Sequence, residues 1–433
     1  MNPYLLFICS VSAMGGLLFG YDWVVIGGAK PFYEQFFGIS QSPVLQGVAM
    51  TTALIGCLFG AMTAGAAADR YGRKPLLIAS AVLFTVSAIA TGLFNDFTLF
   101  NTARFIGGVG IGVASALAPM YIAEVSPAHI RGRMVSLNQM TIVLGILAAQ
   151  IVNMLLARDT TDPVSMAWNL QWGWRWMFWA ETLPAALFLV MSFFIPESPV
   201  FLQLKAEKAK TAGPSQPHSP SKATLGDLFT ARYARVLLLG LVIAVFQQWC
   251  GTNVIFNYAE EIFTSAGYNV DGMFINIVIT GIANVLFTFV ALYTIERWGR
   301  RTLMLLGAGG LGLIYLTLGT CYYTGQTGIL MVALVVAAIS CYAMTLGPVT
   351  WTLLAEIFPN RIRGVAMATC TFALWVGCCT LTFLFPPMNA ALGSSGSFWI
   401  YSAICLSAFI FLYHRCPETK GKSLEQLEQE LTL

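Results

Sequence analysis

The stretch Asp69-Arg-Tyr-Gly-Arg-Lys74 has a close copy, Glu296-Arg-Trp-Gly-Arg-Arg301, which begins 227 positions further along the chain. A second pair of similar segments, Ala123–Gly132 and Ala355–Gly364, is separated by 232 positions. Two unrelated segments that recur at nearly the same offset indicate an internal repeat. The sequence therefore predicts two structurally equivalent halves.

The composition around these loops argues against a soluble protein. Of the 433 residues, 57% are hydrophobic and only 10% are charged, whereas soluble domains carry about 25% charged residues. So few charges cannot cover a globular surface of this size, and we expect the lipid bilayer to be the solvent. The ten cysteines form no C-x-x-C pair and the three histidines are scattered, so we expect neither a disulfide framework nor a metal site.

The apolar stretches predict an all-α integral membrane protein with twelve transmembrane helices, since each crossing needs about 20 mainly apolar residues. Nineteen of the 23 lysines and arginines follow even-numbered stretches. Because basic loops stay in the cytoplasm, both termini are predicted to be cytoplasmic. The predicted spans are 4–29, 44–68, 75–94, 97–122, 134–157, 174–195, 234–264, 271–295, 302–322, 327–354, 364–386 and 397–414.

The repeat and the span count together predict the domain organisation. Six spans separate the repeated loops, so both copies face the same side of the membrane, as in transporters built from parallel repeats. Residues 203–232 include a stretch rich in proline, glycine and serine, which is typical of a flexible linker. We predict an N-terminal six-helix bundle at 1–202, a cytoplasmic linker at 203–232, a C-terminal six-helix bundle at 233–416 and a cytoplasmic tail at 417–433.

The repeated loops combine carboxylates with arginines on the predicted cytoplasmic side. We expect their ion pairs to hold this side closed in one state and to separate in another, because carboxylates add nothing to the topology signal. The alternative is that the basic turns only retain the loops in the cytoplasm. The predicted gate comprises Asp69, Arg70, Arg73, Glu124, Arg131, Arg133, Glu197, Glu296, Arg297, Arg300, Glu356, Arg361 and Arg363.

Asp22, Arg104 and Glu181 lie inside predicted spans, where charges are rare and usually functional. Asp22 comes late in the outward-running first span and Arg104 early in the inward-running fourth, so both fall in the outer half. We predict that Asp22 pairs with Arg104 when ionised and releases it when protonated, which couples a proton to helix movement. Glu181 in the sixth span is a third candidate for proton coupling. The alternative is a static ion pair that fixes helix register.

Amide side chains also recur inside the predicted spans. Such side chains donate and accept hydrogen bonds at once, which suits a neutral ligand rich in hydroxyl groups. Gln248 and Asn253 lie five residues apart on either side of Gly251, where a distorted helix would bring them toward one centre. Hydrogen bonding between helices is the alternative role for such residues. The amide candidates are Gln139, Gln247, Gln248, Asn253 and Asn284.

Taken together, these motifs resemble the sugar porter family of the major facilitator superfamily, and the nearest pattern is that of bacterial proton–monosaccharide symporters. The motifs occur in order along nearly all predicted spans, and they include Gly15–Asp22, Asp69–Lys74, Arg104–Gly108, Gly173–Phe178, Pro196–Pro199, Gln247-Gln248, Gly347–Trp351 and Pro417–Lys422. The resemblance implies the major facilitator fold. It also implies that the five amide candidates and Trp351 contact sugar, with Phe19 and Trp375 as apolar walls.

The sequence departs from the pattern of the xylose symporters at Ile146, Asn257 and Leu374, which implies a different polar lining of the pocket. The family usually has arginine at the position of Val200, so we expect Glu197 to lose one ion-pair partner. Proton-coupled members carry aspartate at the position of Asp22, whereas facilitative members typically carry asparagine.

From these features we expect proton-coupled symport of a monosaccharide, a hexose or a pentose, by alternating access. A facilitative sugar uniporter and a non-transporting sugar receptor are the alternatives. We find no nucleophile elbow, P-loop or zinc motif, so we expect no enzyme activity and no cofactor. The expected partners are sugar, protons and the lipid bilayer, without nucleic acid. We expect a monomer in the plasma membrane, most simply a bacterial inner membrane.

Overall fold

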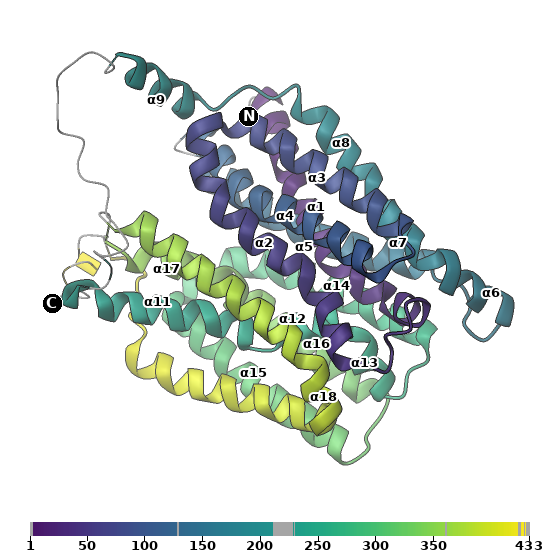
Figure 1. Ribbon diagram of the computed structural model, residues 1–433. Helices are drawn as coiled ribbons and strands as arrows, with labels where there is room; N and C mark the ends of the chain where they lie inside the picture. The colour runs from purple at the N-terminus through teal and green to yellow at the C-terminus, as the bar shows by residue number, and fades with distance from the viewer. Residues whose placement is uncertain are drawn as a thin grey trace. The chain divides into compact units, whose positions relative to one another are not determined.

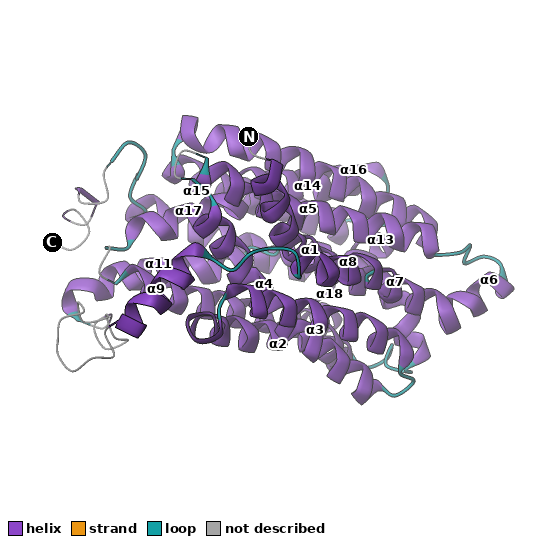
Figure 2. Cartoon of the chain, turned by 90° about the horizontal axis from the view of Figure 1, so that it is seen from above, coloured by secondary structure: helices purple, strands orange, loops and turns teal. Residues whose placement is uncertain are grey.

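The computed structural model describes residues 3–127, 130–210, 228, 230–359, 362–422, 426–427 and 429. Every regular element in these ranges is a helix, and Figure 2 shows helices joined by loops. The prediction of an all-α protein is therefore confirmed. The chain divides into two compact units, Met1–His218 and Ser219–Leu433. This division lies inside the predicted linker 203–232, most of which is outside the described residues.

Unit 1 consists of long helices followed by a broken segment (Figure 1). Polar caps fix where two of the long helices begin, because the Ser42 hydroxyl accepts a hydrogen bond from the Leu45 N–H and the Asp96 carboxylate accepts one from the Leu99 N–H. The elements are α1 (Pro3–Phe36), α2 (Pro43–Tyr71), α3 (Arg73–Leu93), α4 (Phe97–Val125), α5 (Arg131–Leu156), α6 (Pro163–Trp168), the π-helix η1 (Asn169–Gly173), α7 (Trp174–Ala180), α8 (Thr182–Ser192) and α9 (Pro199–Lys210).

Unit 2 repeats this plan with different breaks. In Figure 1 the long α18 turns back on itself, and its backbone leaves the helical region at Gly393, with φ of 69° and ψ of 176°. The elements are α11 (Ala231–Trp249), α12 (Thr252–Asn257), α13 (Ala259–Ser265), α14 (Val270–Trp298), α15 (Arg300–Tyr323), α16 (Ile329–Met344), α17 (Leu346–Ile357) and α18 (Arg363–Arg415).

Ten helical stretches among the described residues are long and apolar enough to cross a membrane. One of them, α18, contains the predicted spans 364–386 and 397–414 on either side of Gly393. The predicted sixth span, 174–195, is divided between α7 and α8, each of which is too short to count alone. The observed helices are thus compatible with twelve crossings, and the crossing number and the cytoplasmic termini stay predictions.

Glycines let α2 and α4 approach closely within unit 1. A Cβ atom added at Gly56 would lie 2.2 Å from the Phe105 carbonyl oxygen, and one added at Gly108 would lie 2.0 Å from the Ala53 carbonyl oxygen. Lipid tails are as apolar as leucine, so helices in a bilayer associate largely through such close packing. The glycine stripes of α2 and α4 therefore stabilise the unit in which the charged site described below is held.

We expect Gly108→Ala to lower the thermal stability of the purified protein, because its methyl group would press α4 against the backbone of α2. Overpacking of this kind costs about 1–3 kcal/mol. Gly65→Ala on α2 is the matched control, since an added Cβ there has nothing within 4 Å. Equal melting temperatures for the two variants would contradict the close contact.

Candidate functional site

Asp22 on α1 and Arg104 on α4 form an ion pair in the interior of unit 1. The Arg104 Nη1 donates to Asp22 Oδ1, and Nη2 donates to the Asp22 carbonyl oxygen over 3.4 Å. Both residues are buried, at 3% and 2% exposed. Asp22 Oδ2 and Arg104 Nε have no hydrogen-bond partner among the described residues. The two predicted partners therefore do meet, and each keeps one unused polar atom.

A second carboxylate lies beside this pair. Glu181, at the junction of α7 and α8, is 2% exposed and interacts electrostatically with both Asp22 and Arg104. The Phe178 ring from α7 covers the guanidinium, with 5.4 Å between Arg104 Cζ and the ring centroid. One buried guanidinium thus faces two buried carboxylates and can compensate the charge of only one of them.

In unit 2 a break in the seventh predicted span brings the amide side chains together, as the sequence predicts. The helix α11 ends at Trp249, and α12 begins at Thr252. Gly251 between them has φ of +86°, a left-handed conformation that favours glycine. The resulting turn lets Asn253 Nδ2 donate to Gln248 Oε1. Two amides that an unbroken helix would separate are therefore in direct contact.

A tyrosine from α16 extends these amides into a continuous chain of hydrogen bonds. Gln248 Nε2 donates to Gln247 Oε1 over 2.5 Å, and Gln247 Nε2 donates to the Tyr342 hydroxyl oxygen over 2.7 Å. We call Gln247, Gln248, Asn253 and Tyr342 the amide chain. Tyr342 was missed by the sequence analysis because it lies in an apolar run, and only the packing of α16 against α11 and α12 identifies it.

The repeated loops form two matching networks, one in each unit. In unit 1, Arg73 Nη2 donates to Glu124 Oε1 over 2.9 Å, and Glu124 Oε2 accepts from the Ser198 hydroxyl over 2.5 Å. Glu197 Oε1 accepts the backbone N–H of Arg73 over 2.9 Å and that of Lys74 over 3.3 Å. The carboxylate of Glu197 thus caps the N-terminus of α3, where negative charge is stabilised.

Unit 2 contains the same arrangement. Arg300 Nη2 donates to Glu356 Oε1 over 3.0 Å, and Glu356 Oε2 accepts from the Thr419 hydroxyl over 2.5 Å. Glu418 caps α15 by accepting the backbone N–H groups of Arg300 and Arg301 over 3.0 and 3.2 Å. Glu418, Thr419 and Ser198 were not predicted, although the weak repeat of Pro196-Glu-Ser in Pro417-Glu-Thr carried the signal.

Comparisons with known proteins match this geometry to one family. Residues 8–431 match the family model described as "Sugar (and other) transporter". The chain belongs to this family. It is 36% identical to the D-xylose-proton symporter of Escherichia coli K12, over 99% of this chain and 96% of that protein. It is 35% identical to the glucose transport protein of Synechocystis sp. PCC 6803, over 98% of this chain and 97% of that protein.

A solved structure agrees with the family assignment. The inward-open conformation of the xylose transporter XylE from E. coli aligns with a TM-score of 0.85 and 35% identity, covering 99% of this chain and 100% of that one. The predicted resemblance to sugar porters and the major facilitator fold are thereby confirmed. This member of the sugar transporter family is a multi-pass membrane protein and not an enzyme.

The other residues predicted to contact sugar belong partly to unit 1 and partly to unit 2. Asn284 on α14 is buried, but its side chain does not hydrogen-bond to the amide chain in the described structure. Trp375 on α18 is buried, whereas Trp351 on α17 is 38% exposed. Phe19 and Gln139 lie half-buried on α1 and α5 of unit 1. Their contact with sugar stays a prediction.

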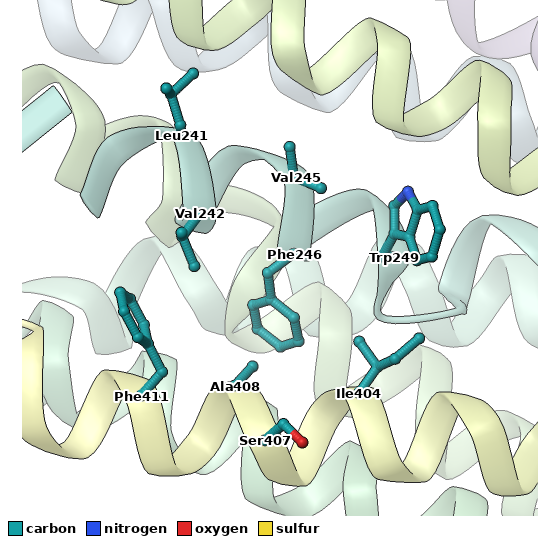
Figure 3. A pocket seen from close by; sticks show the side chains of 9 residues that line it. All are labelled: Leu241, Val242, Val245, Phe246, Trp249, Ile404, Ser407, Ala408 and Phe411. Atoms are coloured by element: carbon teal, nitrogen blue, oxygen red, sulfur yellow. The ribbon is translucent and has the colours of Figure 1, made fainter. Parts of the chain in front are cut away.

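An apolar cavity of about 480 Å³ lies between α11 and the second arm of α18. Figure 3 shows that Ser407 and Trp249 supply its only polar side-chain atoms, and the Trp249 indole already donates to the Gly377 carbonyl oxygen over 3.0 Å. Because sugar hydroxyls need several polar partners, this cavity does not suit a sugar. Its lining residues are Leu241, Val242, Val245, Phe246, Trp249, Ile404, Ser407, Ala408 and Phe411.

The predicted gate residues divide into those that the networks use and those that they do not. Asp69 lies 3.6 Å from Arg73 Nη2 at the margin of the first network. Four arginines of the predicted gate have no carboxylate partner among the described residues. Arg70 lies over the Tyr71 ring, and Arg297 lies over the Tyr293 ring. Arg363 donates to the Phe358 carbonyl oxygen, and Arg131 is exposed. Arg361 and the side chains of Arg133 and Glu296 lie outside the described residues.

The expectation that Val200 leaves Glu197 with one ion-pair partner fewer stays a prediction, and backbone groups satisfy the Glu197 carboxylate without arginine at that position. Val200 is exposed at 38% on α9, and Glu197 is satisfied by backbone N–H groups of α3 and by the Ser198 N–H at 2.8 Å. The backbone of α3 is present whatever residue occupies position 200. The absence of arginine there therefore leaves Glu197 without an unmet charge.

We expect Glu124→Gln to destabilise the purified protein, because it leaves the buried Arg73 guanidinium without its ionic partner. Removing one partner of a buried pair costs about 3–5 kcal/mol, and the 14% exposure of the Glu124 side chain favours the lower value. The control is Asp69→Asn on the same arginine, since Asp69 is 58% exposed and an exposed pair contributes at most about 1 kcal/mol. Thermal unfolding measures the stability of both variants. Similar losses of stability in Glu124→Gln and Asp69→Asn would contradict the expectation that the Glu124 pair contributes more.

Proposed function

We propose that this protein imports a monosaccharide, a hexose or a pentose, together with protons by alternating access. The proposal also places it as a monomer in a bacterial inner membrane. It is supported by the family, by relatives named for xylose–proton symport and for glucose transport, and above all by one observation: the buried Asp22–Arg104 ion pair of unit 1 interacts electrostatically with a second buried carboxylate, Glu181.

The proton-coupling role follows from the cost of charge in a medium of low dielectric constant. Ionised Asp22 is compensated by Arg104, and a proton on Asp22 removes that attraction. Arg104 would then be a buried charge without its partner, which is unfavourable unless another anion is near. Glu181 interacts with both residues, and we propose that its ionised form supplies that anion once Asp22 is protonated. Protonation of Asp22 thus transfers Arg104 from the carboxylate on α1 to the one between α7 and α8, and this transfer weakens the contact between α1 and α4.

We expect Asp22→Asn to abolish uphill sugar accumulation while sugar exchange across the membrane persists. Asparagine keeps the size of the side chain but cannot exchange a proton. The measurement is uptake of labelled D-xylose or D-glucose into proteoliposomes, with and without a pH gradient, alongside counterflow. Asp159→Asn in an exposed loop is the control. Unchanged accumulation in the Asp22 variant would overturn the coupling role, and uptake by the unaltered protein that ignores the pH gradient would favour a facilitative uniporter.

The amide chain is the proposed sugar-binding element of unit 2. Amides can donate to and accept from the same sugar hydroxyl, and Gln248 and Gln247 are only 6% and 5% exposed, so bound sugar would be largely shielded from water. Asn284, Trp351 and Trp375 in unit 2, with Phe19 and Gln139 in unit 1, are proposed as further contacts.

We expect Gln248→Ala to raise KM for sugar by about 5- to 150-fold, because it removes an amide and leaves Asn253 without its acceptor, a loss of about 1–3 kcal/mol. The rate of uptake at several sugar concentrations gives KM. The melting temperature without sugar serves as the control for folding. A KM within twofold of the unaltered protein would place the sugar elsewhere.

A further inference from the structure

We propose that Tyr342 determines sugar specificity by donating its hydroxyl hydrogen to one particular hydroxyl of the bound sugar. This assignment rests on the proposed sugar transport and adds a residue that neither the sequence motifs nor the relatives' names supply. It concerns the end of the amide chain that lies on α16.

The direction of the hydrogen bonds in the amide chain carries the argument. Asn253 donates to Gln248, Gln248 donates to Gln247, and Gln247 donates to the Tyr342 oxygen. Every step uses an amide N–H as donor, so the chain is polarised from α12 toward α16. At its end the tyrosine oxygen is an acceptor, and its own hydrogen has no acceptor among the described residues. A chain of this kind ends in one O–H group that is available for a ligand.

Two other tyrosines of unit 2, Tyr258 and Tyr322, show what a structural hydroxyl looks like. The Tyr258 hydroxyl donates to the Thr382 carbonyl oxygen over 2.6 Å, and the Tyr322 hydroxyl donates to the Ile262 carbonyl oxygen over 2.6 Å. Both of these hydrogens are used to join helices within the unit. Tyr342 is different because its oxygen is used and its hydrogen is not, so its hydroxyl is suited to recognition.

The backbone around Tyr342 holds the ring in place. It lies two residues before the end of α16 at Met344, and the following Thr345 has φ of −123° and ψ of −90°, outside the helical region. A Cβ added at Gly347 would lie 3.3 Å from Tyr342 Cε1, so the ring rests close against the start of α17. A ring fixed by a helix break and by Gln247 presents its hydrogen in one direction, which is the requirement for discriminating between sugar hydroxyls.

The test compares the unaltered protein with Tyr342→Phe in proteoliposomes, using D-glucose, D-xylose and the monodeoxy forms of each. Removing one hydroxyl from the protein is expected to raise KM for the parent sugar about 3- to 10-fold. The deoxy sugar that lacks the partner hydroxyl should show the same KM in both proteins, whereas the other deoxy sugars should show the full increase. Tyr322→Phe is the control, and it should leave the pattern among the deoxy sugars unchanged.

The outcomes separate this assignment from the transport function. A KM increase of the same size for every deoxy sugar would mean that Tyr342 only orients Gln247, and unchanged KM values would remove it from the site; either result overturns the assignment while leaving sugar transport intact. Failure of the unaltered protein to take up any sugar would overturn the proposed function itself. Because phenylalanine preserves the ring, a sugar-dependent rise in melting temperature reports binding if the variant does not transport.

Discussion

The buried cluster of Asp22, Arg104 and Glu181 is the constraint on which the rest of unit 1 depends. An ionised group inside a membrane span is stable only when a group of opposite charge compensates it. One guanidinium can compensate only one of the two carboxylates, so the cluster is neutral when one carboxylate is protonated, and loss of that proton leaves one buried negative charge uncompensated. The helices that carry these groups must then be held close enough to keep water out, and the glycine contacts between α2 and α4 contribute that close packing.

The same requirement, that buried polar atoms be satisfied, explains the structure elsewhere. In the two loop networks, Glu197 and Glu418 cap helix N-termini while Glu124 and Glu356 pair with arginines, so each carboxylate has its own partners. These networks lie within single units, and they therefore fix helix ends in each bundle. In unit 2 the amide chain links its members one after another, and at its end the Tyr342 hydroxyl hydrogen has no acceptor among the described residues.

Much of this could be predicted because it depends on local pattern and topology. The repeated loops gave two equivalent units, the alternation of spans placed Asp22 and Arg104 at the same depth, and Gly251 between two amides indicated the break. Features that depend on packing between distant segments could not be predicted in this way. The role of Tyr342 depends on where α16 packs, and the role of Glu418 depends on the approach of the C-terminal segment to α15. The π-helix at Asn169–Gly173 has no distinct residue pattern. The non-helical backbone at Gly393 agrees with the two separate spans predicted on either side of it.

The central claim is that sugar and proton move together through this protein. The most direct measurement is the pH change when sugar is added to proteoliposomes that start without a pH gradient or a membrane potential. The account predicts that a downhill D-xylose or D-glucose gradient draws protons inward, so the external medium becomes more alkaline in a sugar-dependent manner, and that the change disappears with an ionophore for protons. Sugar entry at a normal rate without any proton movement would contradict the account.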